Sequence, residues 1–110
     1  MLDQALRAIA EPNRRQILHL IQTRELSAGE IASGFKVTRP AISQHLSVLT
    51  AAGLVTYRMA GTRRFYRARP EGLEELKAYL EEFWADRLQV LARVAEVEER
   101  RPKDDGTPGD

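Results

Sequence analysis

Apolar residues recur at helical spacing through the first third of the chain and predict two short helices. Leu2, Leu6 and Ile9 lie three or four residues apart, which predicts the first helix. Pro12 suits the first turn of a second helix, because the N–H that proline lacks has no partner in that turn. The apolar stripe of this second helix follows as Ile17, Leu18, Leu20 and Ile21.

Two further helices are predicted by their start signals. The run Ser27-Ala28-Gly29-Glu30 matches a capping box, in which Ser27 and Glu30 each bond the backbone of the other, and Gly34 ends this short helix. Thr38 then caps a fourth helix that carries Pro40 in its first turn. Its inward stripe is Ile42, Leu46 and Leu49, and Gly53 is expected to end it in a left-handed conformation.

The period changes after Gly53, where residues 54–59 and 63–67 are rich in β-branched and aromatic side chains. They flank Ala60-Gly61-Thr62, so a β-hairpin is expected with its glycine at the tip. Pro70-Glu71-Gly72 then begins a last helix that is expected to reach about Arg100. Residues 101–110 lack an apolar anchor and are predicted to be a disordered tail.

This order of elements predicts a mainly α fold with a small β-hairpin, namely a winged helix-turn-helix. Residues 1–100 are expected to form one domain that includes the last helix, about 70–100. In this fold the fourth helix enters the major groove of DNA, and the hairpin, or wing, meets the backbone or the minor groove. The residues expected to face double-stranded DNA are Thr38, Arg39, Pro40, Ser43, Gln44, His45, Ser47, Arg58, Arg63 and Arg64.

The distribution of charge supports a DNA partner, although the net charge of the 110 residues is only +1. Residues 1–69 hold eleven basic and four acidic side chains, a net +7, and the remainder holds six basic and twelve acidic, a net −6. A basic part joined to an acidic part predicts one surface for a polyanion and another that avoids it. Gln44 has the amide needed for a paired hydrogen bond to adenine, whereas the arginines suit phosphates.

The last helix carries two apolar stripes, and a helix that covers a single core needs only one. We expect the second stripe to meet the twin helix of a second subunit. That stripe consists of Trp84, Leu88, Leu91 and Ala95. A dimer would also present two recognition helices about one DNA turn, ~34 Å, apart.

Several segments together resemble the ArsR family of bacterial winged-helix repressors. They are residues 5–18, 25–32 and 40–49, then Ala52-Gly53-Leu54-Val55 and the wing that ends in Phe65-Tyr66. The resemblance implies a homodimer that joins through its first and last helices and occludes a promoter. It thereby adds Leu2 and Leu6 to the expected dimer interface, and it favours a DNA-side role for His45.

Metal sensing is not expected, because this sequence departs from the family at both known metal sites. Many members hold a Cys-x-Cys in the short helix, where this chain has Ser27 and Gly29. Others bind zinc through Asp and His on the last helix, which here has Asp86 and no histidine. We therefore predict the metal-independent branch and no cofactor, while an unknown effector at the dimer interface stays an alternative.

Other function classes find little support. The chain has no cysteine, no phosphate-binding loop and no nucleophile–base pair: Ser43 and His45 diverge by about 200° on one helix. No apolar run approaches the ~20 residues that span a bilayer, and the first ten residues lack a secretory pattern. We predict a cytoplasmic regulator rather than an enzyme or membrane protein. A winged-helix module that binds another protein remains the alternative.

Overall fold

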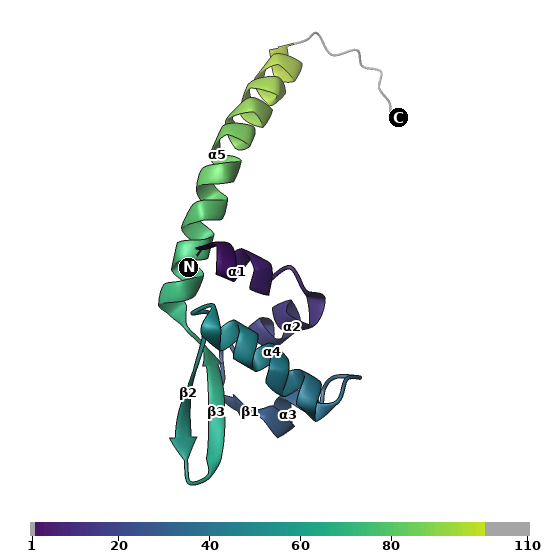
Figure 1. Cartoon of the computed structure of the whole chain (residues 1–110). Helices are drawn as coiled ribbons and strands as arrows, with labels where there is room; N and C mark the ends of the chain where they lie inside the picture. The colour runs from purple at the N-terminus through teal and green to yellow at the C-terminus, as the bar shows by residue number, and fades with distance from the viewer. Residues whose placement is uncertain (1, 101–110) are drawn as a thin grey trace. The chain divides into compact units, whose positions relative to one another are not determined.

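The computed structural model describes residues 2–100, and five helices and three strands follow one another along them (Figure 1). The predicted disordered tail, 101–110, lies outside the described residues. The elements are α1 (Leu2–Ala8), α2 (Pro12–Leu20), β1 (Leu26–Ser27), α3 (Ala28–Ala32), α4 (Arg39–Ala51), β2 (Val55–Ala60), β3 (Arg63–Ala68) and α5 (Pro70–Arg100). The winged helix-turn-helix prediction is confirmed, with α4 as its recognition helix and β2–β3 as its wing.

The predicted start signals lie where the helices begin. At α3 the Ser27 side chain accepts from the Glu30 N–H at 3.2 Å, and the Glu30 carboxylate accepts from the Ser27 N–H at 2.8 Å. At α4 the Thr38 hydroxyl accepts from the Ala41 N–H. The cap of α2 was missed: it is Glu11, whose carboxylate accepts from the Asn13 N–H at 2.6 Å.

The sheet contains one strand more than the hairpin predicted from the sequence. Its order is β1-β3-β2, with both pairs antiparallel. In β1, Leu26 pairs with Tyr66 and Ser27 with Phe65. A two-residue strand shows no alternation, and Ser27 also caps α3, so the pattern gave no sign of it. The wing closes through Gly61-Thr62, where Gly61 has φ 65°.

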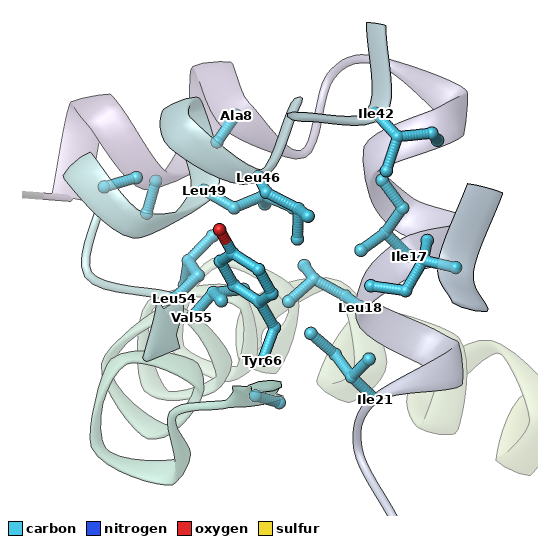
Figure 2. Close-up of a cluster of buried hydrophobic side chains, with 14 of the residues drawn as sticks. Ala8, Ile17, Leu18, Ile21, Ile42, Leu46, Leu49, Leu54, Val55 and Tyr66 are labelled. Carbon is cyan, nitrogen blue, oxygen red and sulfur yellow. The ribbon is translucent and has the colours of Figure 1, made fainter. Parts of the chain in front are cut away.

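The core of the unit that extends from the N-terminus to Lys77 lies between the helices and the inner face of the sheet. Figure 2 shows side chains of α2, α4 and both long strands gathered there. The predicted inward stripe of α4, Ile42, Leu46 and Leu49, is fully buried. The start of α5 contributes Leu73 and Leu76. Residues 78–100 of α5 form a second unit and are described separately.

Candidate nucleic-acid interface

The face of α4 opposite its buried stripe is polar and open to solvent. Ile42 and Leu46 point into the core, so the side chains about half a helical turn away point outward. Six of the seven residues predicted to lie in or beside the major groove are exposed: Thr38, Arg39, Pro40, Ser43, Gln44 and Ser47. The short side chains of Ser43 and Ser47 leave the backbone of α4 free to approach a duplex closely.

His45, the seventh residue of that group, points elsewhere. Its side chain is 17% exposed, and its Nε2 lies 3.0 Å from a carboxylate oxygen of Glu11. Its Nδ1 lies 3.3 Å from a guanidinium nitrogen of Arg14. The imidazole is thus held by the start of α2, and its DNA-side role stays a prediction.

The wing arginines are exposed, but they differ in their neighbours. Arg58 on β2 donates from Nε to both carboxylate oxygens of Glu25, at 2.9 and 3.1 Å. Its Cζ lies 5.2 Å from the centre of the Phe65 ring, and that of Arg63 lies 5.1 Å from it. The Glu25 carboxylate offsets the charge of Arg58, which the sequence gave no sign of because the two residues are 33 positions apart.

Arg63 and Arg64 lie at the tip end of β3, and neither forms an ion pair within residues 2–100. Arg63 donates to the Ser27 hydroxyl at 3.1 Å. Arg64 lies 4.6 Å over the ring of Tyr57. A hydrogen bond with Tyr66, together with the nearby Tyr57, raises the pKa of the Arg64 guanidinium further above its ordinary value. Both side chains are therefore fixed cations, suited to phosphates.

Part of the basic charge of residues 1–69 serves the fold instead. Arg14 donates from Nε to the carbonyl of Ala8 at 2.6 Å, and Arg15 donates to that of Ile9 at 2.7 Å. These carbonyls end α1, where a cation is favourable. Arg14 and Arg15 thus keep their charge but also have a structural role at the end of α1.

The apolar side chains predicted for the dimer interface fall into two groups. On α5, Trp84 is 46% exposed, Leu88 60% and Leu91 62%, and Ala95 is also exposed. Leu2 and Leu6 on α1 are half-buried against the core. The exposed α5 row is thus Trp84, Leu88, Leu91 and Ala95. The other apolar stripe of α5 packs on the core through Leu73 and Leu76, and it is exposed at Leu80, Phe83, Val90, Val94 and Val97.

Metal-ligating side chains do not gather in groups of three or more within residues 2–100. Ser27, at one position of the family's thiolate site, is instead committed to the α3 cap. At the other, a methyl group added to Gly29 would lie 3.8 Å from Cζ of Arg39. Over the same residues, none of the helices is long and apolar enough to pass through a membrane.

Comparison with known proteins adds sequence relatives and solved structures. A family model described as "Bacterial regulatory protein, arsR family" matches residues 11–57, which run from the cap of α2 into β2. The HTH-type transcriptional regulator Rv2034 of Mycobacterium tuberculosis (strain ATCC 25618 / H37Rv) is 43% identical over 96 residues, which are 87% of this chain and 90% of that protein.

One further sequence relative and one solved structure agree with this family match. The transcriptional repressor SdpR of Bacillus subtilis (strain 168) is 34% identical over 65 residues, 59% of this chain and 72% of that protein. A crystal structure of a possible transcriptional regulator for arsenical resistance superimposes with a TM-score of 0.72 at 45% identity. That superposition covers 84% of this chain and 96% of the solved one.

Proposed function

Because the chain belongs to the ArsR family of bacterial DNA-binding transcriptional regulators, we propose that it is a repressor that binds an inverted-repeat operator as a homodimer. Each subunit lays α4 in the major groove and its wing along the adjoining backbone. Repression follows when the dimer occludes a promoter, and its partner being chromosomal DNA, it acts in the cytoplasm. The relative SdpR, a repressor, supports this direction of regulation.

The observation that carries the proposal is the polar, exposed face of α4 beside the arginine-bearing wing. Ser43, Gln44 and Ser47 offer hydrogen-bonding groups short enough for base edges. Arg63 and Arg64 supply charge, so affinity is expected to fall steeply as salt rises. The uncharged side chains then choose the sequence, while the guanidinium groups hold the duplex.

The exposed apolar row of α5 supports the dimer. Burying one large apolar side chain stabilises by roughly 1.5–3 kcal/mol, so Trp84, Leu88 and Leu91 together can offset much of the cost of association. We propose that α5 pairs with its copy through this row, with Leu2, Leu6 and Ala95 alongside. Residues 1–100 then act as one DNA-binding and dimerising domain.

Sedimentation of the full chain tests the dimer. The wild type is expected at twice 12.5 kDa, and Trp84→Glu is expected to shift it toward 12.5 kDa. Gln89→Glu is the matched control, because it adds the same charge at a polar position of the same helix. A wild-type monomer at micromolar concentration that still protects an operator would refute the dimer.

Transcription in vitro from the chain's own upstream region tests the direction of regulation. We expect the dimer to shift this DNA and to lower transcript yield, and the Trp84→Glu variant to do neither. A higher yield would make the chain an activator. If the upstream DNA is not shifted while the protein is dimeric, the protein-binding alternative gains support over operator binding.

A further inference from the structure

A polar hollow of about 260 Å³ separates the recognition helix from the wing. Three arginines, two serines, a threonine, an alanine and a tyrosine line it, and no acidic residue does. The residues are Ser27, Ala28, Arg39, Ser43, Thr62, Arg63, Arg64 and Tyr66. Three like charges around one small space repel each other unless an anion lies among them, so the hollow is matched to an anion.

Neutral contacts hold the guanidinium groups of Arg63 and Arg64 in place. Arg63 donates to the Ser27 hydroxyl at 3.1 Å, Arg64 lies 4.6 Å over the Tyr57 ring, and Arg39 lies beside the backbone of Gly29. None of the three forms an ion pair in the described part of the chain. The two held arginines of the wing lose little conformational entropy when an anion binds.

Ser27 anchors the wing side of the hollow. The residue is 5% exposed, and its Oγ accepts two hydrogen bonds, from the Glu30 N–H at 3.2 Å and from Arg63. The hydroxyl itself hydrogen-bonds the Glu30 carboxylate, so Ser27 ties Arg63 of the wing to the cap of α3.

The nearby acid is already engaged. Glu30 does not line the hollow, and its carboxylate accepts from the Ser27 N–H at 2.8 Å. That bond, a second one with the Ser27 side chain, and the charges of Arg63 and Arg24 lower the pKa of Glu30. It therefore stays ionised as the capping residue of α3, while the arginine cluster keeps its outward charge.

We propose that this hollow binds one phosphate group of the DNA backbone, shared by Arg39 of α4 and Arg63 and Arg64 of the wing. The inference deepens the proposed operator binding and rests on it. A tetrahedral phosphate offers several acceptors to converging guanidinium forks. Arg39 is then a positioning residue for the duplex rather than a reader of bases, and the phosphate ties the wing to the helix that reads the groove.

Titration of the full chain with inorganic phosphate, at constant ionic strength against chloride, tests the hollow. The arginine Nε–H signals of Arg39, Arg63 and Arg64 are expected to shift in NMR spectra, while that of Arg67, an exposed arginine of β3 outside the hollow, does not. The double variant Arg39→Gln/Arg64→Gln is expected to lose the response. Equal shifts at Arg67 would reduce the effect to general screening and overturn the site.

DNA binding by the same variants distinguishes a backbone phosphate from a free ion. Each bound phosphate contributes about 0.9 to the slope of log K against log salt, so one shared phosphate predicts a total loss of about 0.9 in the double variant. A loss of about 1.8 would mean two separate phosphates, and no loss would mean that the hollow takes free phosphate instead. Either result overturns the proposal.

Thermal unfolding of each variant checks that it is folded, which is expected because Arg39 and Arg64 are exposed. A failure of the proposed repressor function would give a different result. A chain that shows the loss of about 0.9 and yet leaves transcription unaltered would keep the phosphate site and lose the repressor assignment.

Discussion

The imidazole of His45 on α4 lies between two side chains at the start of α2, 3.0 Å from Oε2 of Glu11 and 3.3 Å from Arg14. Arg14 in turn donates to the carbonyl of Ala8, the last residue of α1. These contacts link three helices by polar groups at the edge of the core. The side of α4 that faces α2 is therefore set by polar contacts as well as by apolar packing.

His45→Ala is expected to lower the free energy of unfolding by roughly 1–3 kcal/mol, because it leaves a buried carboxylate oxygen of Glu11 without the imidazole that faces it. Urea unfolding measures this. His19→Ala is the control, since His19 is exposed and its loss is expected within about 0.5 kcal/mol. Equal stability of the two variants would show that the Glu11 contact contributes nothing.

Gln44→Ala is expected to reduce the preference for operator over random DNA by roughly 1–3 kcal/mol, the worth of one paired contact to a base. Fluorescence anisotropy with both duplexes at one salt concentration measures it. Arg63→Ala is expected instead to weaken both duplexes alike. If Gln44→Ala also weakened both equally, Gln44 would not read a base.

Glu25→Gln is expected to tighten binding to duplexes of any sequence about two- to fivefold at low salt, because it frees the Arg58 guanidinium from a carboxylate 2.9 Å away. The gain is expected to shrink as salt rises. Glu74→Gln removes the same charge from an exposed position of α5 and serves as the control. Equal gains in both variants would point to net charge rather than to Arg58.

Gly72→Ala is expected to destabilise the protein by roughly 1–3 kcal/mol, because the added carbon would lie 2.0 Å from the carbonyl oxygen of Gly53. The start of α5 thus requires glycine where it crosses the turn after α4. Calorimetry or urea unfolding measures the loss. Gly34→Ala meets only an ordinary contact at 3.8 Å and is expected to be nearly neutral.

The capping box predicts an acid-sensitive element of stability. Hydrogen bonds from Ser27 lower the pKa of Glu30 below its ordinary 4.5. Its contribution is therefore fully present above the unfolded pKa and is lost as pH falls through the folded one. Unfolding curves of wild type and Glu30→Gln are expected to converge below that range, and parallel curves throughout would contradict the assignment.

Residues whose signals are local could be predicted from the sequence. Thr38, Ser27 and Gly61 form helix caps or a turn with residues no more than four positions away. Such local signals can be recognised in the sequence. The Glu25–Arg58 pair, the Glu11–His45 contact and the Ser27–Phe65 bridge join residues more than thirty positions apart. Nothing local encodes them. His45 shows the limit: helical spacing puts it next to Gln44, yet a distant carboxylate decides where it points.

The loop between α2 and β1 is fastened at both ends to β3, by the Ala68 N–H on the Ile21 carbonyl at 3.0 Å and by the pairing of Leu26 with Tyr66. Gln22, Thr23 and Arg24 between these anchors are exposed. Extra residues there would bulge into solvent without moving either anchor. The loop is thus the place where the chain tolerates inserted residues. Because the sequence contains no cysteine, Thr23→Cys would carry a single fluorophore without disturbing the helix-turn-helix or the pairing of the wing strands.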